Sequence, residues 1–242
     1  MATILSYPNK SGAEQMYGIE TMDPDGVTYR LPSKIMYSIY TLDGQKLYDH
    51  YCRTNSSWMN LCNDMRGLKT LDLSGWDTSR CTSLYNAFYG CENLETLNLT
   101  GWSGGNSLTS MYSTFYGCGK LKSLELNNWN VSRVSSLYYC FNSCFKLEKL
   151  DLSGWDTSNC TNFTSMFDGV GSQATATKIW IPSTFVATRA SSATAKPFYN
   201  APTSANVHIY TDATDATTQN WGTVNSGYNM HYSATYQDFL NA

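Results

Sequence analysis

A run of leucines, L-x-x-L-x-L, returns four times along this chain at a nearly constant interval. The first leucines of the runs lie 26, 27 and 26 residues apart and are Leu68, Leu94, Leu121 and Leu147. Two aromatic markers keep the same rhythm and are Trp76, Trp102, Trp129 and Trp155, and Phe88, Phe115, Phe141 and Phe167. Because three separate markers share one period of ~20–29 residues, the pattern predicts a leucine-rich repeat solenoid with one coil per repeat.

Each repeat contains two predicted elements joined by turns. Around Leu71, apolar and polar residues alternate, which predicts a short strand with its leucines on one face. The Gly-Trp-Asp-Thr-Ser segment at 75–79 has turn residues and recurs at 154–158. In residues 84–91, apolar side chains are spaced i, i+3, i+4 and i+7, which predicts a short helix with one inward face. One unit therefore reads strand, turn, short helix, turn.

No single unit can bury its apolar face alone, but stacked units form a continuous core. The predicted fold class is therefore an α/β solenoid, a leucine-rich repeat with short parallel strands and short helices. Residues 56–182 are expected to form it, with a degenerate first unit at 56–67 and a weak last unit at 171–182. Residues 1–55 carry the hairpin signals Asp25-Gly26 and Asp43-Gly44. They are expected to form a β-rich N-terminal cap or a docking segment.

The C-terminal segment, residues 183–242, is expected to be a mixed cap. Residues 183–205 are rich in Ala, Ser and Thr and are predicted to be irregular. Strands are expected at 207–210 and 229–232. Short helices are expected at 212–221, with Asp212 as N-cap, and at 233–240, with Ser233 as N-cap.

The repeat sequence Leu-Asp-Leu-Ser-Gly-Trp-Asp-Thr-Ser, followed by a segment ending in Phe-x-Gly-Cys, resembles the BspA-type leucine-rich repeats of bacterial surface proteins. The resemblance covers residues 58–185. Members of that family are mostly adhesion or host-interaction proteins with differing ligands. The resemblance therefore implies a solenoid fold and a recognition role, and it carries over no catalytic or binding residue.

Composition narrows the possible functions. A net charge of −3 with 14% charged residues does not fit a strongly basic nucleic-acid binder. A secretory signal has a basic region followed by an apolar region, and the first ten residues have neither. The sequence also contains no run of ~18 apolar residues that would predict a membrane span. We therefore expect a chain that folds in the cytoplasm without membrane insertion and reaches the outside by another route, unless a signal was removed.

The eight cysteines fit apolar core positions better than disulfides. Cys91, Cys118 and Cys144 share one position of the repeat, and Val170 takes that position in the next repeat. Because a position that accepts both Cys and Val is apolar, buried free thiols are expected.

No motif predicts catalysis, a cofactor or a metal site. The three histidines, His50, His208 and His231, lie in or beside predicted strands of the terminal segments and accompany no nucleophile motif. No Cys-x-x-Cys pair is present, and Cys140 with Cys144 lacks the further ligands of a zinc site. The expectation is a protein that is not an enzyme.

Two outward faces are candidates for binding. On the predicted helices, tyrosine recurs where Lys or Glu is usual, and Tyr, Ser and Asn are the residues of antibody-like contact surfaces. This first candidate set is Tyr85, Asn86, Tyr89, Tyr112, Tyr116, Tyr138, Tyr139 and Asn142. The alternative set lies on the strands and is Asp72, Asn98, Glu125, Asp151 and Trp180. The ordinary alternatives are tyrosines that merely support neighbouring coils and a solvated polar strand face.

These observations favour a non-enzymatic recognition or adhesion protein that binds a protein or glycan on another cell. The expected context is display on a bacterial surface or as a receptor-binding part of a phage tail, and the missing export signal slightly favours the phage. A structural scaffold or spacer of a virion or cell surface, assembled through residues 1–55, is the second hypothesis. A carbohydrate-active enzyme is the remote third.

Overall fold

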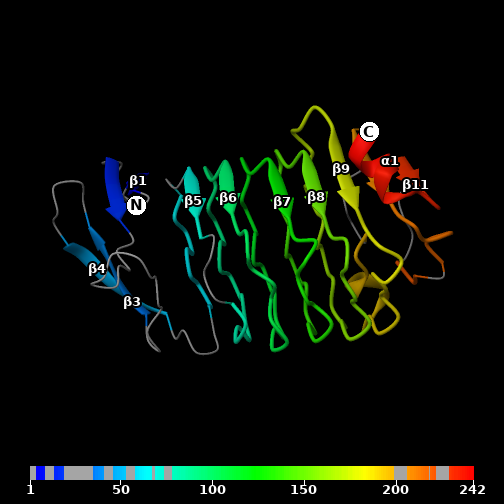
Figure 1. The fold of residues 1–242 in the computed structure, drawn as a ribbon, viewed down its shortest axis with the longest axis horizontal. Coiled ribbons are helices and arrows are strands. Elements are labelled where there is room, and N and C mark those ends of the chain that lie inside the picture. Colours follow the sequence, from blue (N-terminus) through cyan, green and yellow to red (C-terminus); the bar gives the residue numbers. More distant parts are fainter. Residues whose placement is uncertain are drawn as a thin grey trace.

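The computed structural model describes the strands at 4–8, 14–18, 35–40 and 46–52. It also describes residues 58–66, 69–73, 78–198, 206–217, 219–221 and 229–242, with most of their side chains. The repeats form a parallel β-solenoid of about five turns, whose strands stand side by side along the long axis (Figure 1). The predicted solenoid is confirmed, and the α/β description is not, because helix is almost absent.

One row of short strands runs through successive coils: β5 (Thr70–Asp72), β6 (Thr96–Asn98), β7 (Ser123–Glu125), β8 (Lys149–Asp151) and β9 (Thr177–Trp180). The row continues past residue 182 with β10 (Val207–Tyr210) and β11 (Asn229–His231), both paired in parallel. The hydrogen-bonded order is β5-β6 in one sheet and β11-β10-β9-β8-β7 in another. The row is therefore divided once, between β6 and β7.

We number the coils from the residue where each first turn begins: coil 1 from Trp58, coil 2 from Leu84, coil 3 from Met111, coil 4 from Leu137 and coil 5 from Phe163. The expectation of helices at the start of each coil was wrong. In coil 2, Asn86, Phe88 and Gly90 donate their backbone N–H groups to carbonyls of coil 3, at 2.7–2.9 Å. Between these residues, the N–H groups of Ala87 and Tyr89 bond three residues back, whereas an α-helix bonds four residues back.

We call the five segments 58–65, 84–91, 111–118, 137–144 and 163–170 the turn ladder. Two positions of each segment have positive φ and are occupied by Asn60, Asn86, Ser113, Tyr139 and Ser165, and by Asp64, Gly90, Gly117, Ser143 and Gly169. A helix needs negative φ at every residue, so these positions exclude it. Consecutive turns also let each coil lie one strand spacing of ~4.8 Å from the next, whereas a helix with its side chains is ~10 Å wide.

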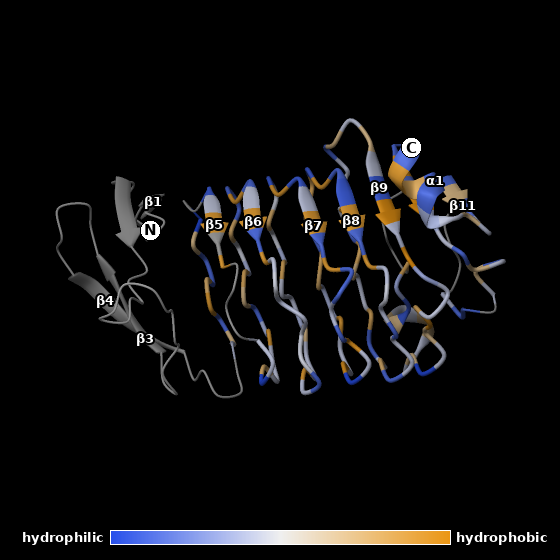
Figure 2. Ribbon diagram, viewed as in Figure 1, coloured by the Kyte–Doolittle hydropathy of each residue, from blue (hydrophilic) through white to orange (hydrophobic). Residues whose placement is uncertain are grey.

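The core lies between the strands and the turn ladder. Phe88, Phe115, Phe141, Phe167 and Phe198 stack in one column, with ring centroids 5.5, 5.6, 6.0 and 5.3 Å apart. Trp102 and Trp129 also stack, at 5.9 Å, while Trp76 lies outside the described residues. Figure 2 shows hydrophobic positions returning at the same level of successive strands. Like residues of neighbouring coils therefore meet, as predicted.

All seven cysteines from Cys62 onward are free and buried, as expected. The sulfhydryl groups of Cys91, Cys118 and Cys144 donate to carbonyls of the preceding coil at 3.1–3.2 Å. The thiols thus fill apolar positions and add one weak hydrogen bond per coil.

The terminal segments agree with the prediction in part. β1 (Ile4–Pro8) pairs antiparallel with β2 (Glu14–Gly18), and β3 (Ile35–Tyr40) with β4 (Lys46–Cys52). The β-rich character of 1–55 is confirmed, but a capping or docking role stays a prediction, because its side chains lie outside the described residues. The helix expected at 212–221 is absent from the described part of that segment, which forms turns.

The closing helix is shorter than expected and begins later. α1 spans Tyr236–Asn241, and its N-cap is Thr235 rather than Ser233. Thr235 and Asp238 form a capping box. The side-chain oxygen of each residue accepts a hydrogen bond from the backbone N–H of the other. Upstream, the irregular stretch contains one 3-10 turn, η1 (Ala193–Ala195). No helix of the described residues is long and apolar enough to cross a membrane.

Candidate functional site

Six tyrosines form two stacked rows on the outside of the turn ladder. In the first row, the rings of Tyr85, Tyr112 and Tyr138 lie parallel, with centroids 4.8 and 4.7 Å apart. In the second row, Tyr89 stacks on Tyr116 at 4.7 Å, and Tyr139 follows at 5.7 Å. All six side chains are half-buried. We call this set the tyrosine surface.

The residue two positions before each tyrosine of the first row fixes its backbone. Ser83, Ser110 and Ser136 lie in register across coils through parallel β-bridges. Their hydroxyls accept the N–H groups of Tyr85, Tyr112 and Tyr138, at 3.2–3.4 Å. Such local side-chain bonds favour turns over helix. The serines therefore place successive tyrosines at equal positions, one coil apart.

Tyr139 enters the second row from a different position of the repeat. The position equivalent to Tyr89 and Tyr116 is held in coil 4 by Asn142, whose exposed fraction is only 7%. Its amide donates to the Ser165 carbonyl, and its oxygen accepts from Ser143. Asn142 is thus a buried structural residue, and its predicted exposure was wrong. Asn86 is half-buried, with φ +53°, and helps shape the turn.

Three tyrosines of the tyrosine surface have raised pKa values. Hydrogen bonding with Tyr139, together with burial, raises the pKa of Tyr138 to about 12. Burial, followed by the neighbouring tyrosines, also raises the pKa values of Tyr112 and Tyr116. Along the solenoid, the surface is flanked by Met59 of coil 1, which is 46% exposed, and by Thr164 and Asp168 of coil 5.

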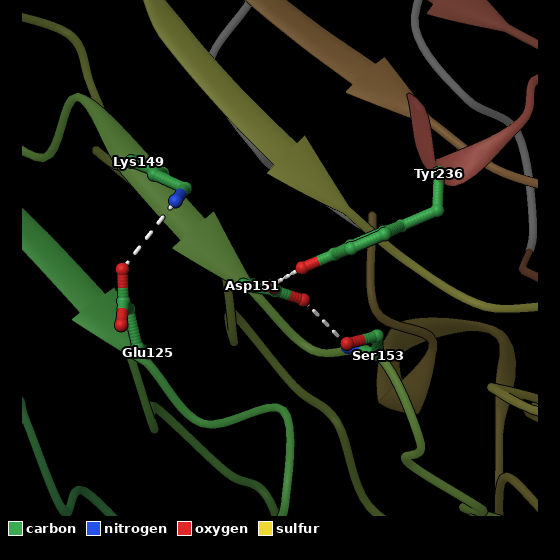
Figure 3. A network of polar contacts seen from close by, with 5 residues as sticks. All are labelled: Glu125, Lys149, Asp151, Ser153 and Tyr236. Carbon is green, nitrogen blue, oxygen red and sulfur yellow. Dashed lines mark hydrogen bonds and ion pairs between the residues drawn. The ribbon is translucent and has the colours of Figure 1, made fainter. Parts of the chain in front are cut away.

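The alternative strand-face set is divided by the C-terminal helix. Tyr236 of α1 donates its hydroxyl to the Asp151 carboxylate, which also accepts the Ser153 N–H at 2.9 Å (Figure 3). Trp180 packs against Tyr236 and Phe239. Asp151 and Trp180 are 2% and 5% exposed. Their availability for binding was wrongly predicted, because α1 covers this part of the face.

The uncovered part of the strand face retains Asn98 and Glu125, while the side chain of Asp72 lies outside the described residues. Glu125 is 70% exposed and forms an ion pair with Lys149 at 3.4 Å (Figure 3). An exposed pair of this kind contributes little to stability. Asn98 and Glu125 line a cleft between β6 and β7 that the sequence interpretation missed. Its signal in the sequence is Asn127-Asn128, where other repeats have Ser-Gly or Thr-Gly.

Two histidines form a polar contact with each other in the described residues. His208 and His231 stack at the end of the strand row, with Nδ1 and Nε2 3.1 Å apart. Burial and the neighbouring His231 lower the pKa of His208. Within the described ranges, no group of three or more His, Cys, Asp or Glu residues is arranged to hold a metal ion.

A comparison with protein families matches the chain to a family described as Mycoplasma protein of unknown function, DUF285. Two overlapping matches cover residues 56–180 and 82–205, which is more than half of the chain. The chain belongs to this family. The DUF285 family lies in the BspA-like and leucine-rich repeat clade, which agrees with the stacked coils. No curated protein and no solved structure matches the chain significantly.

Proposed function

We propose that this DUF285 protein is a non-enzymatic recognition protein, and that the tyrosine surface is its contact with a protein or glycan on another cell. The observation that carries the proposal is the pair of stacked tyrosine rows across coils 2–4. These are outward positions, which a solvated repeat could fill with Lys or Glu.

Preorganisation is the physical advantage of such a surface. A tyrosine offers large apolar contact and a polar hydroxyl with only two side-chain torsions to restrict. Stacking on the neighbouring coil already restricts those torsions before a partner arrives. Binding therefore has a smaller ordering cost than it would on a surface of free side chains.

Display outside the producing cell, on a bacterial surface or in a phage tail, belongs to the proposal. Residues 1–55 would then attach the solenoid to a larger assembly. A scaffold or spacer role would need that attachment but no partner at the tyrosines. Binding experiments therefore separate the two roles.

The test compares three proteins on an array of bacterial cell-surface proteins and glycans. They are the wild type, the triple variant Tyr85→Ser/Tyr112→Ser/Tyr138→Ser, and the control Thr164→Ala/Asp168→Ala, which changes equivalent positions in coil 5. The triple variant should lose at least tenfold in affinity, about 1.4 kcal/mol. The control should bind like the wild type.

Thermal unfolding of all three proteins shows whether a loss of binding comes from misfolding. The triple variant removes two stacked pairs, worth about 0.5–1.5 kcal/mol each, and should still unfold cooperatively. Undiminished binding by a folded triple variant would refute the tyrosine surface. Failure of the wild type to bind any arrayed surface would favour the scaffold role.

A further inference from the structure

The strand row is open between β6 and β7. At the end of each strand, a leucine N–H normally donates to the next coil: Leu73 to Asn98, Leu126 to Asp151 and Leu152 to Trp180, at 2.9–3.1 Å. Leu99, the equivalent residue in coil 2, has no such bond. Some Cα atoms of β6 and β7 still lie within 8 Å. An inserted strand would need two strand spacings, about 9.6 Å, so the opening suits a small ligand.

The turn after β7 explains why the sheet opens. Coils 2 and 4 have glycine in this turn, with φ +91° at Gly101 and +85° at Gly154. A Cβ on Gly154 would lie 2.8 Å from the Asn127 carbonyl, so neighbouring coils approach closely there. Coil 3 has Asn128 instead, without positive φ. We infer that its side chain and different turn geometry hinder the same close approach to coil 2.

The residue ending each strand adds to the difference. Asn98 and Asp151 stabilise their turns by accepting the N–H groups of Thr100 and Ser153, at 3.0 and 2.9 Å. Glu125 is one methylene longer and makes no equivalent bond among the described residues. Coil 3 therefore lacks both the glycine and the side-chain bond that shape the turns of coils 2 and 4.

Two hydrogen-bond donors lose their partners at this opening. The indole N–H of Trp102 donates to the Leu73 carbonyl at 2.8 Å, and that of Trp155 to the Leu126 carbonyl at 3.0 Å. Trp129, which is 2% exposed, makes no such bond within the described part of the chain. Its indole nitrogen is not among the fully buried side-chain atoms without a partner in that part of the chain. Because Trp129 and Leu99 both line the cleft, we infer that these two N–H groups face it.

The cleft has a volume of about 380 Å³, within the range of small-ligand sites. Its polar lining residues are Asn98, Thr100, Ser123, Glu125, Asn127 and Asn128. The side chains of Ser123, Asn127 and Asn128 make no hydrogen bond within the described residues, so their donors and acceptors are available. Asn98 accepts with its oxygen and keeps both amide hydrogens for a ligand.

We propose that the β6–β7 cleft binds one sugar unit of a neutral glycan. Amides and hydroxyls present donors and acceptors at close spacing, which matches the adjacent hydroxyls of a sugar. Among the lining residues, the only ionisable group is the Glu125 carboxylate, which is paired with Lys149. The cleft therefore lacks the cations that an anionic ligand requires. The indole N–H of Trp129 donates to a sugar oxygen, whereas the equivalent N–H groups of Trp102 and Trp155 donate to backbone carbonyls.

This site goes beyond the proposed contact at the tyrosines, with which it shares no residue. The two proposals can therefore fail separately. A sugar bound in the cleft would add a second recognition element to the same rigid coils.

Nuclear magnetic resonance of the ¹⁵N-labelled full chain tests the site directly. Glucose, galactose, mannose and N-acetylglucosamine are each titrated into the tens of millimolar. At least one sugar should shift the Trp129 indole N–H and the Asn127 and Asn128 side-chain amides in a saturable way. The indole signal of Trp155, which already has an acceptor and lies outside the cleft lining, should stay unchanged.

Two variants serve as matched controls. Asn127→Ala/Asn128→Ala should abolish the shift of Trp129, whereas Asn241→Ala, an exposed amide at the C-terminus, should preserve it. The triple tyrosine variant should also preserve it. The proposal is overturned if no sugar shifts Trp129 saturably, if inorganic phosphate alone does so, or if the folded double variant responds like the wild type.

Discussion

Tyr139 has a backbone conformation that bulky side chains rarely adopt. Its φ of +55° lies in the left-handed region, and the same position in other coils holds Asn60, Asn86, Ser113 and Ser165. Such a conformation costs on the order of 1–3 kcal/mol and tends to persist where function needs it. Here the strained position lets the Tyr139 ring extend the second tyrosine row, since Asn142 points inward. The strain is thus consistent with a contact surface.

Replacing Tyr139 with Asn, the residue of coils 1 and 2, separates stability from binding. Asn tolerates positive φ, so the relieved strain should offset the lost ring stacking of about 0.5–1.5 kcal/mol. We expect a free energy of unfolding equal to or above that of the wild type, with weaker partner binding. Urea titration measures the first quantity. A loss greater than about 1.5 kcal/mol would show that Tyr139 is mainly structural.

Phe115 lies at the centre of the phenylalanine column, between Phe88 and Phe141, and is fully buried. Phe115→Ala should lower the free energy of unfolding by about 3–5 kcal/mol, through lost burial and the cavity left behind. Equilibrium urea unfolding checks this, with Thr164→Ala as a half-buried control that should change little. A neutral effect at Phe115 would contradict the stacked core.

Among the elements, the turn ladder shows how far hydrophobic spacing can mislead. Leu84, Ala87, Phe88 and Cys91 are buried, as a helical face would be. Consecutive turns return the chain inward at the same positions, so burial alone does not distinguish them. The deciding signal is the conformational tolerance of Gly90 and of Asn86, which both have positive φ. The inward residues were therefore predicted correctly, while outward Asn142 is buried and the predicted helical backbone was wrong.

The open β6–β7 edge also depends on one turn residue, so Asn128→Gly should change it. Glycine allows the positive φ seen at Gly101 and Gly154 and removes the obstructing side chain. We expect the sheet to close and the unfolding free energy to rise by about 0.5–1.5 kcal/mol for each hydrogen bond regained. Hydrogen exchange at the Leu99 amide should slow. Unchanged exchange there would mean that Asn128 does not hold the cleft open.

For the whole molecule, continuous stacking should shield the thiols. Burial raises the pKa of Cys91 and Cys144 to about 12, from an ordinary value of 9.0. Because the folded-state pKa is raised, their contribution to stability is complete below pH 9 and is lost as the pH rises toward 12. At pH 8.5, iodoacetamide should modify these thiols only after denaturation, as mass spectrometry can show. Rapid modification of the native protein would contradict a closed core.

The solenoid as a whole was predictable because the same apolar residue types recur at the core positions of every repeat. The accessible part of the strand face was not predictable from those repeats. Asp151 is covered through its bond with Tyr236, 85 residues further along the chain, and no local pattern links the two. The cleft escaped prediction for a related reason, since it arises from a mismatch between two coils rather than from a motif within one.

Hydroxyl-radical footprinting of the protein, free and bound to a partner found on the array, tests the central claim most directly. The account predicts that binding protects Tyr85, Tyr112 and Tyr138 from oxidation and leaves Tyr232 and Tyr236, near the C-terminus, unchanged. Protection of the C-terminal tyrosines, with the tyrosine surface still fully reactive, would contradict it.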